Sequence, residues 1–159
     1  MLQDIAPKKL DNQYKPSAEP TDESVVFVFK DRNVLVRQDE GKLFPTFAQL
    51  GRPEGCVYLF TIGKKAFFLL LGDAEPVIPD GFDFEPIKSI RQNKEAKLPS
   101  FYAFYTALHL YGWYRTNRFC GVCGHPTVLD TKERALRCSA CNHVIYPRIN
   151  PAIIVGVLH

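Results

Sequence analysis

Short apolar runs, separated by polar turns, occupy much of the first hundred residues. The first two runs flank Asp31-Arg32, and the last two flank a glycine-containing turn at residues 63–65. The four runs are VVFVFK (25–30), NVLVRQ (33–38), CVYLFTI (56–62) and AFFLLL (66–71). Short runs rich in β-branched and aromatic residues, bounded by turn residues, are typical of strands joined as hairpins. We therefore predict two β-hairpins in this part of the chain.

The pattern differs before and after these runs. Residues 1–24 are rich in Pro, Lys, Asp and Ser with little periodicity, and indicate an extended or loosely packed leader. Three prolines between residues 76 and 86 interrupt the next segment, so we expect a loop there with one short strand. Beyond Ser100, a good helix N-cap, apolar residues recur at helical spacing, which predicts a helix. The apolar positions are Phe101, Phe104, Tyr105, Leu108, Tyr111 and Trp113.

The composition, 46% hydrophobic and 23% charged residues, is normal for a globular protein. Both long apolar runs, AFFLLL and PAIIVGVL, are far shorter than the roughly 20 residues needed to span a bilayer. The mixed N-terminus, MLQDIAPKKL, does not have the charged-then-apolar pattern of a secretion signal. These features argue against a membrane protein, and we expect a cytoplasmic location.

Four of the five cysteines form two identically spaced C-x2-C pairs with fourteen residues between them. Zinc prefers four tetrahedral sulfur or nitrogen ligands, and each pair can supply one edge of that tetrahedron. We therefore predict a zinc ion bound by Cys120, Cys123, Cys138 and Cys141. Four sulfur ligands leave no position for water, so the zinc should be structural.

The other histidine and cysteine residues are weaker candidates for metal ligands. His125 and His143 adjoin the two pairs and are alternative ligands, although the complete cysteine set disfavours them. Without a secretion signal, a disulfide framework is disfavoured as well. Cys56 stands alone in an apolar run, and we expect it to be a small buried hydrophobe.

Positive charge is concentrated in the second part of the sequence. Residues 101–159 contain six Lys or Arg and two Asp or Glu. Basic residues beside an aromatic helix allow one alternative, a stand-alone zinc ribbon that binds nucleic acid. Against it, the aromatic residues recur at the spacing of a buried stripe, and no basic residues alternate with them. A purely structural or dimerisation module is a further alternative.

Two segments around the cysteine pairs carry a family resemblance. ALHLYGWYRTNRFCGVCGH begins at residue 107, and CNHVIYPRINPAIIV ends at residue 155. Together they resemble the NADH pyrophosphatase branch of the Nudix hydrolases. The resemblance implies a β-rich N-terminal domain, a helix, a zinc ribbon and a catalytic Nudix domain that uses Mg²⁺ or Mn²⁺. It also implies cleavage of NADH or NAD to NMN(H) and AMP, removal of NAD caps from RNA, and a homodimer.

The Nudix box, G-x5-E-x7-R-E-x2-E-E-x-G, does not occur in these 159 residues. Its glutamates hold the divalent cations that the reaction requires. We therefore predict that this chain alone is inactive, and that the apolar run near its end is the first strand of a truncated Nudix domain.

The resemblance also implies three substrate-binding residues. They are Arg91 in S-I-R-Q, Glu133 five residues before Cys138, and Tyr146 in Y-P-R. An arginine can clamp a phosphate, a carboxylate can hold ribose hydroxyls, and a tyrosine can stack on a base or hydrogen-bond to it. The competing interpretation is that Arg91 and Glu133 are solvated charges and that Tyr146 only packs the ribbon.

The fold class that follows is α+β, with four parts. They are an antiparallel β-rich domain (1–98), a connecting helix (99–117), a four-cysteine zinc ribbon (118–147) and the strand of the truncated Nudix domain (148–159).

Overall fold

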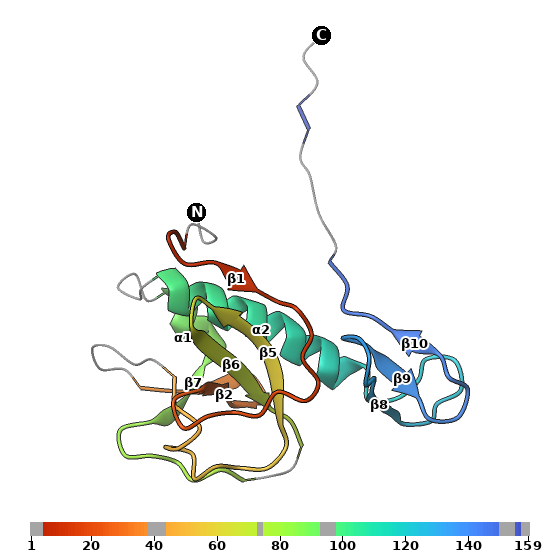
Figure 1. The fold of residues 1–159 in the computed structure, drawn as a ribbon, viewed down its shortest axis with the longest axis horizontal. Coiled ribbons are helices and arrows are strands. Elements are labelled where there is room, and N and C mark those ends of the chain that lie inside the picture. Colours follow the sequence, from red (N-terminus) through yellow and green to blue (C-terminus); the bar gives the residue numbers. More distant parts are fainter. Residues whose placement is uncertain (1–4, 38–43, 73–74, 93–97, 150–154, 157–159) are drawn as a thin grey trace. The chain divides into compact units, whose positions relative to one another are not determined.

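The computed structural model describes residues 5–37, 44–72, 75–92, 98–149 and 155–156 (Figure 1). The chain divides into two compact units, residues 1–112 and residues 113–159. The first unit contains two sheets and most of the helical residues, and the second contains a small sheet with the paired cysteines. The α+β class predicted from the sequence is confirmed.

The larger sheet of the first unit is built around a β-hairpin. Its strands are β1 (Leu10–Asp11), β5 (Cys56–Ile62), β6 (Lys65–Leu70) and β2 (Val25–Phe27), in the order β1-β5-β6-β2. The β5–β6 hairpin confirms the prediction from the sequence. Its turn needs a glycine, because Gly63 has φ of 61°, in the left-handed region that other residues rarely adopt. The leader, residues 1–24, contributes the short edge strand β1, which was not predicted from its sequence.

The second sheet of this unit corrects the other predicted hairpin. It contains β3 (Phe29–Lys30), β4 (Asn33–Val36) and β7 (Asp83–Pro86), in the order β3-β4-β7. Only β3 forms the expected antiparallel pair with β4. The first half of the run, β2, instead lies parallel to β6 in the larger sheet. Strand β7 is the short strand expected in the proline-rich segment, and it pairs antiparallel with β4.

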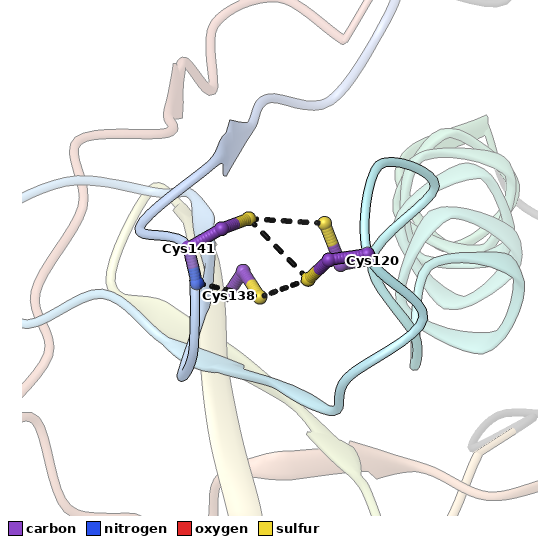
Figure 2. A group of neighbouring side chains, drawn as sticks. Cys120, Cys138 and Cys141 are labelled. Carbon is purple, nitrogen blue, oxygen red and sulfur yellow. Dashed lines mark hydrogen bonds between the residues drawn. The ribbon is translucent and has the colours of Figure 1, made fainter.

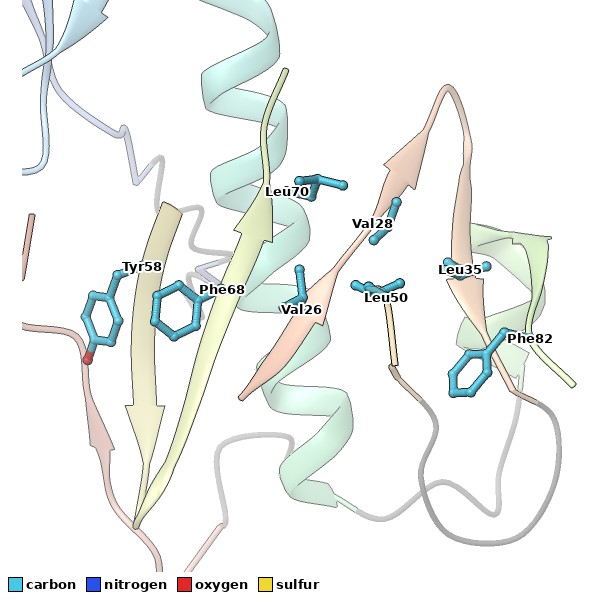
Figure 3. Packing of buried hydrophobic residues seen from close by; sticks show 8 residues of the cluster. All are labelled: Val26, Val28, Leu35, Leu50, Tyr58, Phe68, Leu70 and Phe82. Atoms are coloured by element: carbon cyan, nitrogen blue, oxygen red, sulfur yellow. The ribbon is translucent and has the colours of Figure 1, made fainter. Parts of the chain in front are cut away.

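Residues 25–30 contribute strands to two sheets because their side chains are buried on both faces of the run. Side chains alternate along a strand, so Val26 and Val28 point away from Phe27 and Phe29. The first two belong to an apolar cluster between the strands (Figure 3). The members of that cluster are Val26, Val28, Leu35, Leu50, Tyr58, Phe68, Leu70 and Phe82.

On the other face of the run, aromatic rings meet helix α2 (Leu98–Thr116). The ring of Phe104 lies 6.2 Å from that of Phe29 and 5.7 Å from that of Phe44. The Phe29 and Tyr111 rings stack at 4.6 Å. Helix α2 confirms the helix predicted from the aromatic spacing. Of the six predicted apolar positions, Phe101, Phe104 and Trp113 are buried and the other three are half-buried.

A short helix, α1 (Ile87–Gln92), precedes α2 and was not predicted. Six residues are too few to show a helical period in the sequence. The backbone N–H of Ile87 donates to Arg32 O at 3.0 Å, which holds the start of α1 beside the turn of the β3–β4 hairpin.

The second unit is built on a three-stranded antiparallel sheet. Its strands are β8 (Thr127–Leu129), β9 (Leu136–Cys138) and β10 (Val144–Ile145), with β9 in the centre. Few apolar side chains are buried in the described part of this unit. The predicted strand at 148–159 falls mostly outside the described residues. No helix in the described part of the chain is long and apolar enough to cross a membrane.

Packing in the apolar cluster can be tested with a matched pair of substitutions. Val26→Ala removes a side chain that is 0% exposed, whereas Val77→Ala removes one that is 62% exposed. The lost burial and the cavity should lower the free energy of unfolding by about 2–3 kcal/mol for Val26→Ala. Val77→Ala should change it by less than about 0.5 kcal/mol. Urea unfolding followed by circular dichroism measures both, and equal effects would contradict this packing.

Candidate metal centre and the adjoining loop

The two cysteine pairs adopt the same backbone conformation. In the first, the N–H of Cys120 donates to His125 O at 2.8 Å, and the N–H of Gly124 donates to Cys120 O at 2.9 Å. In the second, the N–H of Cys138 donates to His143 O at 2.9 Å. There the N–H of Asn142 donates to Cys138 O at 3.2 Å. Each pair is therefore closed by backbone hydrogen bonds at equivalent positions.

A left-handed residue follows each cysteine pair. Gly124 has φ of 76° and Asn142 has φ of 59°. Glycine adopts this conformation without strain, and asparagine tolerates it better than most residues do. The left-handed backbone conformation thus explains why a glycine follows the first pair and an asparagine follows the second.

The four sulfur atoms converge between the two pairs (Figure 2). All four lie within 4.8 Å of one another. The Cys123 Sγ lies 3.4 Å from both Cys138 Sγ and Cys141 Sγ, and Cys120 Sγ lies 3.7 Å from Cys141 Sγ. A tetrahedral zinc with Zn–S bonds of about 2.3 Å has sulfur–sulfur edges of about 3.8 Å. The donor set and its spacing therefore fit zinc.

Backbone N–H groups point at the sulfur of the first cysteine in each pair. Val122 N donates to Cys120 Sγ, and both Cys141 N and Ala140 N donate to Cys138 Sγ, each at 3.4 Å. With the bond from Cys141 N as the largest cause, these bonds lower the pKa of the Cys138 thiol to about 6 from its ordinary value of 9.0. A metal ligand must be a thiolate, and the N–H groups of Cys141 and Ala140 favour the thiolate form of Cys138.

The other candidates from the sequence lie outside this group. The group contains no histidine, and His125 Nδ1 lies 3.2 Å from Cys123 O. Cys56 lies in the first unit, half-buried against the apolar cluster, where burial raises the pKa of its thiol to about 11. It packs as a small hydrophobe, as expected, but it is half-buried rather than buried.

Two of the three predicted substrate residues touch each other. Tyr146, which directly follows β10, donates its hydroxyl to Glu133 Oε1 at 2.6 Å. Both residues are exposed, and the carboxylate raises the pKa of the Tyr146 phenol above its ordinary value of 10.0. Arg91 lies in α1 in the other unit, and its side chain lies outside the described part of the chain.

A polar residue that the sequence did not single out organises the loop between β8 and β9. Asp130 is 7% exposed, and its Oδ1 accepts the backbone N–H groups of Lys132 at 2.8 Å and Glu133 at 3.2 Å. Its Oδ2 accepts Arg137 Nε at 2.8 Å and Arg137 Nη2 at 2.7 Å. In turns, an Asp side chain often accepts a hydrogen bond from the backbone N–H two residues later. An Asp directly before the polar segment T-K-E-R could therefore have predicted this turn.

The hydrogen bonds to Asp130 affect its ionisation. The N–H of Lys132 and the guanidinium of Arg137 favour the charged carboxylate and keep the pKa of Asp130 below its ordinary value of 3.8. A buried carboxylate with such partners stays ionised at neutral pH.

Comparison with known proteins places this centre in a class. Residues 115–146 match the NADH pyrophosphatase zinc ribbon domain. That span contains both cysteine pairs, the three-stranded sheet and the Asp130 loop. The second unit therefore contains a zinc ribbon of the NADH pyrophosphatase type.

Longer similarities extend into the first unit. The chain is 32% identical over 120 residues to the NAD-capped RNA hydrolase NudC of Salmonella typhimurium, covering 74% of this chain and 46% of that protein. It is 32% identical over 97 residues to the NudC of Citrobacter koseri, covering 60% of this chain and 38% of that protein. The NudC of Pasteurella multocida is 51% identical over 47 residues, or 28% of this chain and 18% of that protein.

These similarities confirm, over the aligned residues, the resemblance to the NADH pyrophosphatase branch of the Nudix hydrolases. The aligned part of the chain spans less than half the length of each of these relatives.

Zinc ligation by the four sulfurs predicts the effect of Cys138→Ser. A serine hydroxyl is a poor zinc ligand, so this variant should contain well below one zinc per chain and should lose the fold of the second unit. Elemental analysis of protein purified without added metal measures the zinc. Circular dichroism and the fluorescence of Trp113, a buried residue at the start of this unit, report its fold.

Cys56→Ser is the matched control, since Cys56 lies outside the sulfur group. It should keep one zinc per chain. A wild-type chain purified without zinc, or a Cys138→Ser variant with a full complement, would contradict the assignment.

Proposed function

We propose that this chain is the N-terminal and zinc-ribbon part of a Nudix hydrolase that cleaves the pyrophosphate of NADH or NAD to NMN(H) and AMP. The observation that carries the proposal is the coincidence of the four-sulfur centre with the match to the NADH pyrophosphatase zinc ribbon domain. NAD-capped RNA is a further proposed substrate, supported by the names of the relatives.

The proposed role of the metal is structural. Zinc bound by the four cysteines would contribute on the order of 10 kcal/mol to the folding of a unit with a small apolar core. The buried side chains in the described part of this unit are those of Trp113, Tyr114, Cys120, Asp130, Ala135, Leu136 and Cys138. The zinc would take no part in the cleavage, because four sulfur ligands leave no site for water or substrate.

The proposed substrate contacts are Arg91, Glu133 and Tyr146. Arg91 would bind phosphate through its guanidinium, and the other two would bind the nucleoside portion through hydrogen bonds or stacking. Cleavage itself is assigned to Mg²⁺ or Mn²⁺ held by a Nudix domain, whose motif is not among these residues. The proposed location of the enzyme is the cytoplasm.

The proposed domain division follows from the same resemblance to the NADH pyrophosphatase branch. Residues 1–98 would form the β-rich N-terminal domain, 99–117 the connecting helix, 118–147 the zinc ribbon and 148–159 the first Nudix strand.

A stand-alone nucleic-acid-binding ribbon is the weaker alternative. The aromatic helix that suggested this alternative does not offer exposed rings for base stacking, because Phe101, Phe104 and Trp113 are each no more than 7% exposed. The exposed rings of the described second unit are those of Phe119 and Tyr146, at 61% and 51%. One of the basic residues of the second unit, Arg137, is also engaged with Asp130. The buried helix and the engaged Arg137 weaken the two features on which this alternative was based.

Activity assays separate the parts of this proposal. The complete protein purified from its native host should release AMP and NMNH from NADH in the presence of Mn²⁺, as measured by chromatography. The 159-residue chain should release neither, because it lacks the carboxylates that hold the catalytic cations. Absence of cleavage by the complete protein would defeat the proposed function. Turnover that stays with the repurified 159-residue chain would defeat the assignment of catalysis to another domain.

A homodimer is the proposed assembly, with residues 1–98 supplying most of the interface. Residues 149–159 include an apolar run that could add to that interface by pairing as a strand. Sedimentation at micromolar concentration should show a dimer for residues 1–159 and also for residues 1–148. A monomer in both cases would contradict the dimer, and a dimer only with residues 149–159 would move the interface to them.

A further inference from the structure

We propose that Asp130 is a positioning residue that, together with Arg137, holds Glu133 against Tyr146 and so builds a preformed carboxylate–phenol site on the zinc ribbon. The substrate role of this site rests on the proposed function. The positioning itself rests on hydrogen bonds within the second unit.

The backbone of Glu133 is fixed on both sides. Its N–H donates to Asp130 Oδ1 at 3.2 Å, and its carbonyl oxygen accepts the N–H of Ala135 at 2.8 Å. The N–H of Asp130 in turn donates to Ala135 O at 3.0 Å, which closes the loop. The Glu133 side chain therefore leaves the loop from a defined backbone position.

Arg137 connects this loop to the sheet. It lies on β9, the central strand, where it pairs with Val128 of β8 and Val144 of β10. Its guanidinium contacts Asp130 Oδ2 through both Nε and Nη2, while Asp130 Oδ1 accepts backbone N–H groups of the loop. A charged pair of this kind, with a nearly buried carboxylate, fixes geometry more firmly than an exposed pair does.

The register of the sheet brings Tyr146 to the same place. Ile145 of β10 pairs with Leu136 of β9. The same register continued by one residue places Tyr146 beside Ala135, at the end of the loop. The hydroxyl of Tyr146 then reaches Glu133 Oε1 at 2.6 Å.

The resulting pair has hydrogen-bonding capacity for a ligand. Among the described residues, no hydrogen bond reaches Glu133 Oε2, and a carboxylate accepts more than one bond. An acceptor of this kind suits the hydroxyl groups of a ribose, whereas it would repel a phosphate. The site is therefore matched to the nucleoside portion of a dinucleotide.

Direct evidence would come from the Tyr146 phenol, whose ¹³Cζ resonance responds to the hydrogen bond that the hydroxyl donates. The chain contains seven tyrosines, so a Tyr146→Phe variant assigns the signal. Glu133→Gln removes the charged acceptor and defines the resonance position of a Tyr146 without its carboxylate. The zinc-loaded 159-residue chain, labelled at tyrosine ¹³Cζ and measured at neutral pH, provides the reference.

Asp130→Asn should move the Tyr146 resonance most of the way to its position in Glu133→Gln, although Glu133 and Tyr146 are both still present. The matched control is Asp22→Asn, which also breaks a fork to an arginine, Arg52, but lies in the other unit with both partners 59% exposed. It should leave the resonance unchanged. An unchanged resonance in Asp130→Asn, with one zinc per chain, would overturn the positioning role.

Loss of zinc by Asp130→Asn would show that the variant no longer folds, and then Arg137→Gln replaces it. This variant keeps both backbone bonds to Asp130 Oδ1 and removes only the clamp on Oδ2. A shift of the Tyr146 resonance in the same direction is expected, smaller because these backbone bonds remain, and an unchanged resonance would overturn the positioning role.

Kinetics of the complete enzyme test the substrate role separately. Loss of a hydrogen bond to a charged group should raise KM for NADH about tenfold in Glu133→Gln and Asp130→Asn, with kcat little changed. Unchanged KM in both variants would remove Glu133 from the substrate site while the resonance still decides the positioning. An inactive wild-type enzyme would defeat the proposed function alone.

Discussion

Convergence of four sulfur atoms is the constraint on which the second unit depends. The sulfurs come from two pairs fourteen residues apart in the sequence, yet all lie within 4.8 Å of one another. A three-stranded sheet of two or three residues per strand has little stability of its own in water. A metal held at this point joins both ends of the ribbon, so the sheet, the loop and Tyr146 all take their places relative to it.

In the second unit, whose apolar core is small, hydrogen bonds fix the loop between β8 and β9. Asp130 is the one charged residue of the described second unit that is buried, and its position is compatible with charge because hydrogen bonds compensate both oxygens. Its contacts run from the sheet to the loop that bears Glu133. The fixed backbone and the candidate ligand site are thus parts of one hydrogen-bonded arrangement.

The first unit is organised by a different constraint, burial on both faces of residues 25–30. Valines fill the space between the strands and phenylalanines meet α2. A hairpin open to solvent on one face would leave one of these sets exposed, at a cost of about 1.5–3 kcal/mol for each large side chain. The run therefore changes sheets at Val28, whose carbonyl oxygen accepts the N–H of Leu35 at 2.9 Å.

Local chemistry in the sequence was sufficient for features defined by neighbouring residues. The C-x2-C pairs, the Gly63 turn and the aromatic stripe of α2 follow from spacing that the chain itself imposes. Pairing over long distances was not readable in this way: the parallel contact of β2 with β6 joins segments some forty residues apart. Likewise, an aspartate, an arginine and a tyrosine at 130, 137 and 146 carry no common signal along the chain. Only the antiparallel register of β8, β9 and β10 brings them to one loop, because a strand pair sets residues distant in sequence side by side.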